Sequence, residues 1–289
     1  MNPKKARVLV LGASGMLGHA VFRLFSESDH DGTWGTVRSS PSILISDGQQ
    51  AGHLISGIDV ENADALTRVF AAIRPTHVVN CVGVVKQLAT AVDTLTAVPL
   101  NTLLPHRIAR LCELGGARLI HISTDCVFSG TKGMYTESDT PDARDLYGLS
   151  KLLGEVDYPH AVTLRTSIIG HELSGAHGLV EWFLAQKSVV KGYLRAVFSG
   201  LPTVELARVI RDHVLPNQEL RGVYHVSAEP INKYELLNLV ARTYGVQTRI
   251  EADNQVVIDR SLDSARFRAL TGYKPVSWPE LVRSMYEFR

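Results

Sequence analysis

A short apolar run that leads directly into three evenly spaced glycines constrains the fold of this chain most. Residues 7–11 (Arg-Val-Leu-Val-Leu) have the composition of a buried parallel strand. Gly12, Gly15 and Gly18 come next, and residues 16–25 carry apolar side chains at helical spacing. A strand, a glycine turn and a helix in this order are typical of a dinucleotide-binding unit.

The glycine turn predicts a site for a pyrophosphate, because a helix N-terminus offers unpaired N–H groups and a positive dipole end. Its spacing is G-x-x-G-x-x-G rather than G-x-G-x-x-G, so a tight strand–helix turn without a ligand stays open as the alternative. The expected cofactor contacts in this turn are Gly12, Ser14, Gly15, Met16, Leu17 and Gly18.

Strand-like and helix-like segments alternate along the first part of the chain, which predicts a Rossmann-type α/β fold with a doubly wound parallel sheet. Strands are expected at 32–37, 53–60, 77–83, 118–124, 161–165 and 222–227, and helices at 63–73, 100–114, from Tyr147 onward, and at 179–186, 203–214, 233–244 and 279–288. We expect a nucleotide-binding core of residues 1–168, to which 203–227 return, and a smaller substrate lobe of 169–202 and 228–289.

Composition argues against several classes of protein. Thirty basic and 29 acidic residues leave a net charge of +1, which favours neither nucleic acid nor an anionic membrane. No apolar stretch is long enough to span a bilayer, and we expect no leader segment. Cys81, Cys112 and Cys126 lack metal-ligand spacing, so we expect no metal site and a reduced, cytoplasmic protein.

Tyr147 and Lys151 are four positions apart, so a helix presents both on one face. A free tyrosine has a pKa of about 10. A neighbouring cation favours the phenolate and lowers that pKa towards neutrality. Such a pair also occurs by chance, but downstream of a nucleotide site it predicts hydride chemistry with a tyrosine acid.

The end of the second strand bears on the choice of coenzyme. Arg38, Ser39 and Ser40 stand there, and no acidic residue follows until Asp47. NAD-preferring sites usually have an acid at this point, whereas an arginine accommodates the 2′-phosphate of NADP. We therefore expect NADP(H); the alternative is an arginine solvated on a loop.

These motifs together resemble the extended short-chain dehydrogenase/reductases, and within them the dTDP-4-dehydrorhamnose reductase branch. The matching segments are 12–18, 80–83, Asn101, 123–130 (Ser-Thr-Asp-Cys-Val-Phe-Ser-Gly), 147–151, 165–167, 201–204 and 222–227. The resemblance implies NADPH-dependent reduction of a keto group, at C4, on a deoxysugar carried by a nucleoside diphosphate, for the synthesis of polysaccharide or glycan precursors.

The resemblance also implies roles for single residues. Tyr147 donates a proton to the carbonyl oxygen, Lys151 holds the nicotinamide ribose, and Thr124 hydrogen-bonds the carbonyl. Further cofactor contacts carried over are Asp59, Val60, Cys81, Val82, Gly83, Asn101 and Ser123. From the residues alone, Thr124 could instead cap the strand end, and Asn101 could be the N-cap of the following helix.

Substrate contacts are expected at Lys86, Asp125, Trp182 and Arg260. Lys86 could equally be a surface lysine, and Trp182 a core residue. Cys126 replaces the tyrosine common in the branch. Strand alternation predicts that its side chain points away from that of Asp125, which favours a buried thiol over an acid or base.

Two other functions stay open. One is a nucleotide-sugar epimerase with tightly held NAD, which Arg38 disfavours. The other is a non-catalytic regulatory subunit that binds NADP and a partner enzyme, as some proteins of the branch do. The resemblance is also compatible with a homodimer.

Overall fold

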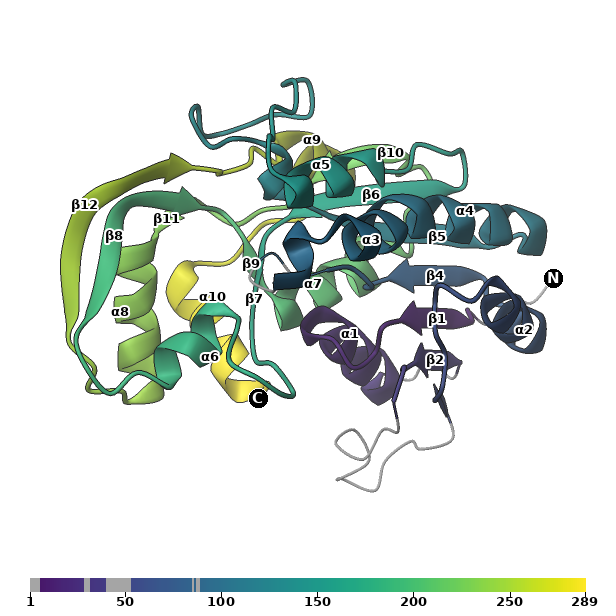
Figure 1. The fold of residues 1–289 in the computed structure, drawn as a ribbon, viewed down its shortest axis with the longest axis horizontal. Coiled ribbons are helices and arrows are strands. Elements are labelled where there is room, and N and C mark those ends of the chain that lie inside the picture. The colour runs from purple at the N-terminus through teal and green to yellow at the C-terminus, as the bar shows by residue number, and fades with distance from the viewer. Residues whose placement is uncertain (1–5, 29–31, 40–52, 85, 87–88) are drawn as a thin grey trace.

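The computed structural model describes residues 6–28, 32–39, 53–84, 86 and 89–289. Its centre is a sheet of seven parallel strands in the order β10-β6-β5-β4-β1-β2-β3 (Figure 1). The strands are β1 (Val8–Leu11), β2 (Thr33–Thr36), β3 (Leu54–Ile55), β4 (His77–Asn80), β5 (Arg118–Thr124), β6 (Ala161–Thr166) and β10 (Gly222–His225). The predicted α/β fold with a parallel sheet is confirmed.

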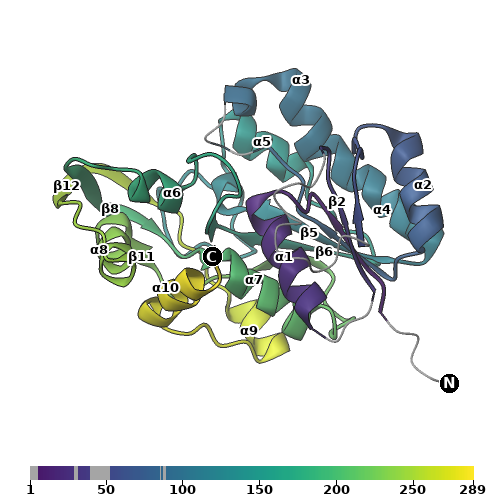
Figure 2. The same ribbon diagram turned by 90° about the horizontal axis from the view of Figure 1, so that it is seen from below.

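Helices cover both faces of this sheet (Figure 2). In β1, Val8 and Val10 pack into one core cluster and Leu9 and Leu11 into another. Side chains alternate across a strand, so a strand that is apolar throughout needs a helical layer on each side. One layer has α1 (Met16–Glu27), α7 (Thr203–Val209), α9 (Ala265–Thr271) and α10 (Trp278–Glu287); the other has α2 (Ala63–Ile73), α3 (Thr94–Ala97), α4 (Leu104–Gly115) and α5 (Leu146–Leu153).

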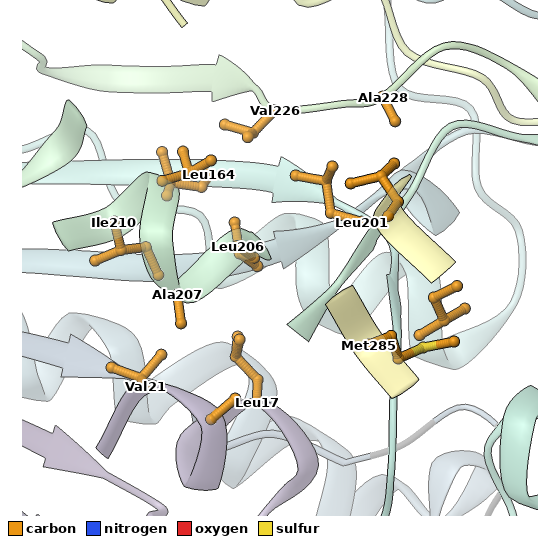
Figure 3. Packing of buried hydrophobic residues seen from close by; sticks show 14 of the residues in the cluster. Leu17, Val21, Leu164, Leu201, Leu206, Ala207, Ile210, Val226, Ala228 and Met285 are labelled. Atoms are coloured by element: carbon orange, nitrogen blue, oxygen red, sulfur yellow. The ribbon is translucent and has the colours of Figure 1, made fainter. Parts of the chain in front are cut away.

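The contact between α1 and α7 holds a late segment of the chain on the core. Leu17 and Val21 of α1 face Leu206 and Ala207 of α7 in one apolar cluster (Figure 3). A fully buried leucine contributes about 1.5–3 kcal/mol relative to an exposed one. The helix continues as a π-helical segment, η5 (Ile210–Val214), before the chain returns to the sheet and β10 pairs with β6.

A smaller three-stranded sheet lies beside the core and was not predicted. Its order is β11-β8-β12, and α6 (Leu179–Leu184) and α8 (Lys233–Tyr244) lie near it (Figure 1). Its strands are β8 (Val190–Phe198), β11 (Ile231–Asn232) and β12 (Ile250–Asp259), and a short pair, β7 (Ile168–Ile169) and β9 (Leu201–Pro202), connects to it. Most of β12 is exposed and rich in acid and amide side chains, which are uncommon in strands.

Several predicted elements differ from the structure by one to three residues, such as the strand expected at 77–83, which ends at Asn80, and two differ by more. The strand expected at 53–60 is only Leu54–Ile55, because the chain turns at Gly57 with φ +73°. The helix expected at 100–114 begins earlier: Asp93 caps α3, and the π-helical η3 (Val98–Leu103) joins α3 to α4. A short 3₁₀ turn, η2 (Ala89–Val92), precedes them. Within the described ranges, no helix has the length and hydropathy needed to cross a bilayer.

Candidate active site

The three-stranded sheet, α6 and α8 are called the smaller unit. A cavity of about 400 Å³ opens where the carboxyl ends of the central strands meet this unit. This is the size of an ordinary small-molecule site, at the usual edge of a parallel sheet. The predicted site residues that line it are Ser14, Gly15, Met16, Leu17, Cys81, Val82, Gly83, Lys86, Ser123, Thr124, Asp125, Tyr147 and Lys151. The predicted residues that do not line it are Gly12, Gly18, Arg38, Ser39, Asp59, Val60, Asn101, Trp182 and Arg260.

The glycine turn brings the N-terminus of α1 to one side of this cavity. Gly12 has φ +82°, which favours glycine, and a Cβ on Gly18 would lie 2.0 Å from the Gly12 carbonyl oxygen. The helix can therefore pack against the turn only without a side chain at position 18. Gly15 is the N-cap and supplies no side-chain cap, so N–H groups of the first turn are left for a ligand.

Tyr147 is the second residue of α5, whose N-cap Asp145 accepts a hydrogen bond from Gly148 N at 2.8 Å. A Cβ on Gly148 would lie 2.4 Å from the carbonyl oxygen of Cys126, so this helix packs directly on the segment after β5. Burial raises the pKa of Tyr147 above its ordinary value, and a hydrogen bond with the Thr124 side chain opposes the rise in part. The phenol therefore keeps its proton at neutral pH.

Lys151 is buried one turn further along α5, and its Nζ donates a hydrogen bond to the Ile122 carbonyl oxygen at 2.7 Å. Burial lowers the pKa of Lys151 to about 8, against the opposing charge of Glu155. The prediction that Lys151 brings the pKa of Tyr147 down is wrong for this structure. Desolvation of the phenol raises its pKa by more than the hydrogen bond with Thr124 lowers it. The Lys151 ammonium instead donates to the Ile122 carbonyl oxygen.

Asn101 is buried inside η3 and is not an N-cap, so that interpretation is wrong. The reason is that the helical run begins at Thr94, seven residues before Asn101. Its Oδ1 accepts from Val84 N at 2.9 Å, and its Nδ2 donates to Ser150 Oγ at 3.1 Å. Asn101 therefore connects the loop after β4 to α5 and stands behind the cavity wall.

Thr124 ends β5, and the next three residues form a 3₁₀ turn, η4 (Asp125–Val127). The Thr124 hydroxyl accepts from Cys126 N at 3.1 Å and donates to Asp125 Oδ1 at 3.2 Å, so it caps this turn and also lines the cavity. The predicted orientation of Cys126 is wrong: Asp125 and Cys126 both line the cavity, because strand alternation stops at Thr124. Burial raises the pKa of Asp125 and raises that of Cys126 to about 11.

Lys86 reaches the same cavity from the loop after β4. Its Nζ lies 3.3 Å from Asp145 Oδ2 and 5.8 Å from the ring centroid of Tyr147. The side chain is 36% exposed, so it is both a cavity residue and open to solvent.

Arg38 and Ser39 follow β2 after the buried Val37, and both are exposed. The Ala13 N–H donates to the Thr36 carbonyl oxygen at 2.9 Å, so the end of β2 adjoins the glycine turn. Asp59 is exposed and accepts from Glu61 N, and Val60 packs against the core. Ser40 and Asp47 lie outside the described residues.

Trp182 and Arg260 belong to the smaller unit and lie outside the cavity. Trp182 on α6 is 38% exposed, whereas its neighbours Val180 and Phe183 fill the core. Arg260 follows β12, and its Nε donates to the Phe128 carbonyl oxygen at 2.9 Å. Its charge still acts on Asp125, since it opposes the burial-driven rise of the pKa of that carboxyl.

The cavity residues of the smaller unit that the sequence analysis missed include Phe198 at the end of β8 and Lys233 at the start of α8. Asn232 is a strong N-cap, and a lysine directly after it stands at the positive end of the helix dipole. A lysine in this unfavourable position was the sequence signal that could have indicated a functional role for Lys233. Among the residues with described placement, no group of three or more His, Cys, Asp or Glu side chains is arranged for a metal ion.

Proteins that resemble this chain include a subunit of methionine adenosyltransferase and a sugar-nucleotide reductase. Methionine adenosyltransferase 2 subunit beta of Danio rerio is 32% identical over 83% of this chain and 74% of its own length. The dTDP-4-dehydrorhamnose reductase of Aggregatibacter actinomycetemcomitans is 25% identical over 78% of this chain and 74% of its own length.

The fold of the chain matches solved structures over nearly its whole length. The crystal structure of a hypothetical dTDP-4-dehydrorhamnose reductase from Sulfolobus tokodaii has a TM-score of 0.77 at 25% identity and covers 94% of this chain and 98% of its own. The dTDP-4-dehydrorhamnose reductase of Bacillus anthracis, in complex with NADP, has a TM-score of 0.79 at 20% identity, over 99% and 100% of the two chains. The profile of the RmlD substrate binding domain matches residues 6–287, and the chain therefore belongs to the RmlD substrate binding domain family.

Proposed function

We propose that this protein reduces a keto group, at C4 of a deoxysugar carried by a nucleoside diphosphate, with NADPH as the coenzyme, and that the product is a glycan precursor. One observation carries the proposal: Thr124, Tyr147 and Lys151 line the same cavity as the glycine turn at the N-terminus of α1. A proton donor, a second hydroxyl and an ammonium beside a dinucleotide site are the groups that carbonyl reduction needs.

The residues present fit a dinucleotide. The first turn of α1 has free N–H groups for a diphosphate, and Gly15 lines the cavity with only the Gly12 carbonyl oxygen near a built Cβ. Arg38 stands at the same sheet edge, where a guanidinium suits a 2′-phosphate. The relative from Bacillus anthracis was solved with NADP, which supports this choice.

When bound, NADPH would supply a hydride to the carbonyl carbon. Tyr147 holds its proton at neutral pH and would donate it to the carbonyl oxygen as negative charge develops there. The Thr124 hydroxyl donates to Asp125 in the ligand-free protein. With substrate bound, it would donate to the carbonyl oxygen of the substrate instead. Two donors aimed at a developing alkoxide stabilise the transition state. Lys151 would bind the ribose of the coenzyme.

Different segments of the chain are proposed to bind the coenzyme and the substrate. Residues 1–168 and 203–227 would hold the coenzyme, and residues 169–202 and 228–289 would hold the sugar nucleotide. Asp125 and Lys86, on the cavity wall, are proposed to contact the sugar. Trp182 and Arg260 would contact the nucleotide end only if the smaller unit moves towards the cavity.

The test is consumption of NADPH with a panel of dTDP-, UDP- and GDP-linked 4-keto sugars, with NADH run in parallel. Wild type should oxidise NADPH with at least one of them. Tyr147→Phe should lower kcat by about 100-fold or more, as expected for loss of a general acid, and should keep its affinity for NADPH. Tyr193→Phe is the matched control, since Tyr193 is half-buried on β8 outside the cavity.

A second candidate function is a non-catalytic, NADP-binding subunit of another enzyme. The observation in its favour is the 32% identity with a protein named as subunit beta of methionine adenosyltransferase 2. Binding of NADPH without turnover of any keto sugar, and full function of Tyr147→Phe in cells, would favour the subunit. Tightly bound NAD with no net coenzyme oxidation would instead favour a nucleotide-sugar epimerase.

A further inference from the structure

Lys233 lines the cavity, and the chemistry proposed above gives it no role. β11 pairs Ile231 with Phe198 and ends at Asn232, which caps α8 by accepting a hydrogen bond from Glu235 N at 2.8 Å. Lys233 is therefore the first residue of α8, held beside the end of β8 by both strand pairing and capping. Its side chain lines the cavity together with those of Phe198 and Asp125.

The ammonium of Lys233 lacks the partners that a half-buried charge normally has. It forms neither a hydrogen bond nor an ion pair with any residue whose placement is described, and it lies over the ring of Phe198, with the centroid 3.9 Å away. It also stands at the positive end of the α8 dipole, which disfavours a cation. Burial lowers the pKa of Lys233 to about 8. The Lys233 ammonium is therefore in an unfavourable position for a charge, and its N–H donors are available to a ligand.

Asp125 supplies the complementary group across the same part of the cavity. The carboxylate and the ammonium act on each other electrostatically: Asp125 opposes the fall in the pKa of Lys233, and Lys233 opposes the rise in that of Asp125. They nevertheless form no direct ion pair, which leaves the Lys233 donors unused. A charged donor and a charged acceptor on the wall of one cavity suit neighbouring hydroxyl groups, each of which can both accept and donate.

We propose that Lys233 and Asp125 form the subsite for the hexose of the sugar nucleotide, in which the ammonium donates to one ring hydroxyl and the carboxylate accepts from its neighbour. This deepens the proposed function and rests on it. Lys233 is a substrate-positioning residue here: it touches the sugar beyond the reacting carbonyl, which Tyr147 and Thr124 would contact.

Calorimetric titration tests the subsite without any turnover. The probes are dTDP, UDP and GDP, each paired with its hexose conjugate (dTDP-rhamnose, UDP-glucose and GDP-mannose), with NADP⁺ present. For at least one pair, wild type should bind the conjugate more tightly than the free nucleotide. Lys233→Met should weaken binding of that conjugate by about 10- to 100-fold, as expected for a hydrogen bond to a charged group, and leave the free nucleotide and NADP⁺ unaffected.

Two further variants separate positioning from a structural role. Lys233→Arg keeps the charge and should recover part of the lost affinity. Lys191→Met removes an exposed lysine of the same unit, which pairs with Asp253, and should bind like wild type. The melting temperature of ligand-free Lys233→Met should equal or exceed that of wild type, since an unpaired cation is removed.

The outcomes are distinguishable. Unchanged binding of the conjugate by Lys233→Met, or an equal loss for conjugate and free nucleotide with a lower melting temperature, would overturn the subsite. Failure of wild type to bind any free nucleotide or conjugate would overturn the proposed function, and the subsite with it.

Discussion

The side-chain amide of Asn101 donates a hydrogen bond of 3.1 Å to the hydroxyl of Ser150, the residue directly before Lys151. The carbonyl oxygen of the same side chain accepts from Val84 N at 2.9 Å. One buried residue thus fixes α5 relative to the loop that carries Gly83, whose added Cβ would lie 3.7 Å from Lys151 Nζ. It does so from a π-helical segment, a form often found at functional sites.

Replacing Asn101 by Ala should therefore affect both stability and turnover. The variant leaves the Val84 N–H without its acceptor and removes the donor to Ser150 Oγ, which keeps its hydrogen bond to the Tyr147 carbonyl oxygen. The free energy of unfolding should therefore fall by about 1–3 kcal/mol. NADPH turnover should fall as well, because Lys151 loses its support. Asn62→Ala is the control: it removes the N-cap of α2 and should cost about 1 kcal/mol without changing turnover. Equal turnover of the two variants would contradict the positioning role.

The central sheet could be predicted because its strands are buried on both faces. Such strands are rich in apolar residues, as at residues 8–11 (Val-Leu-Val-Leu) and 119–122 (Leu-Ile-His-Ile), and glycine or polar turns separate them from amphipathic helices. The smaller sheet has no comparable pattern. In β8, Lys191, Gly192 and Arg195 interrupt the apolar positions, and β12 is an exposed edge strand. Their pairing depends on contacts between residues about 60 positions apart, which local periodicity does not record.

The candidate site could be predicted as far as the parallel sheet reaches. The ends of β1, β4 and β5 must meet at one edge, so the residues after them could be grouped from the sequence. Lys233 could not be grouped with them from the sequence, because the pairing of β11 with β8 is what brings α8 to the cavity. The orientation of Cys126 was predicted wrongly because the strand gives way to a 3₁₀ turn one residue earlier.

Gly18→Ala should disrupt the coenzyme site, because its Cβ would lie 2.0 Å from the Gly12 carbonyl oxygen, a backbone atom that cannot swing aside as a flexible side chain can. Forcing α1 away from the turn should cost about 1–3 kcal/mol of stability and weaken NADPH binding. Gly115→Ala is the matched control, since nothing lies within 4 Å of its built Cβ in α4. It should be neutral or stabilise the protein by up to about 1 kcal/mol. Equal melting temperatures for the two variants would refute the close packing.

Arg38→Ala should change the choice of coenzyme. Loss of charge-assisted hydrogen bonds to the 2′-phosphate, worth about 1.5–3 kcal/mol, should raise KM for NADPH by about 10- to 100-fold and leave KM for NADH unchanged. Steady-state kinetics with both coenzymes measure this. Arg110→Ala removes an exposed arginine of α4 that pairs with Glu113 and should alter neither value. A similar change for NADPH and NADH would show that Arg38 does not read the phosphate.

Lys151→Met should stabilise the coenzyme-free protein at neutral pH. Burial lowers the pKa of Lys151 from 10.5 to about 8, so between these pH values the unfolded chain binds a proton that the native state does not. The contribution of this lysine to stability is therefore unfavourable below pH 8 and recovers as the pH rises towards 10.5.

The gain at pH 7 should be about 1–3 kcal/mol, from the size of the shift less the lost hydrogen bond to the Ile122 carbonyl. Urea unfolding of wild type and variant at pH 7 and pH 10 measures it, and the difference should shrink at the higher pH. Lys191→Met, at an exposed lysine, should give no gain at pH 7. A Lys151→Met variant less stable than wild type at pH 7 would mean that the ammonium is structural.

The buried ion pair of Arg165 and Glu155 should act as a unit. Arg165 Nη2 lies 2.7 Å from Glu155 Oε2 and Arg165 Nε lies 2.8 Å from Oε1, and the side chains are only 6% and 8% exposed. Ser123 Oγ also donates to Oε1 at 2.7 Å, directly before Thr124. Arg165→Met alone should cost about 3–5 kcal/mol, because it leaves a carboxylate buried without its partner.

The double variant Arg165→Met/Glu155→Leu should recover much of that loss, because it leaves no unpaired charge and fills the same volume. Denaturant unfolding of wild type, both single variants and the double variant completes the cycle. Losses that simply add would mean that each group is stabilised separately. Recovery of stability without recovery of turnover would mean that the ion pair also supports the reaction. In that case the Glu155 carboxylate, which accepts from Ser123, would hold the end of β5 and therefore Thr124 in place.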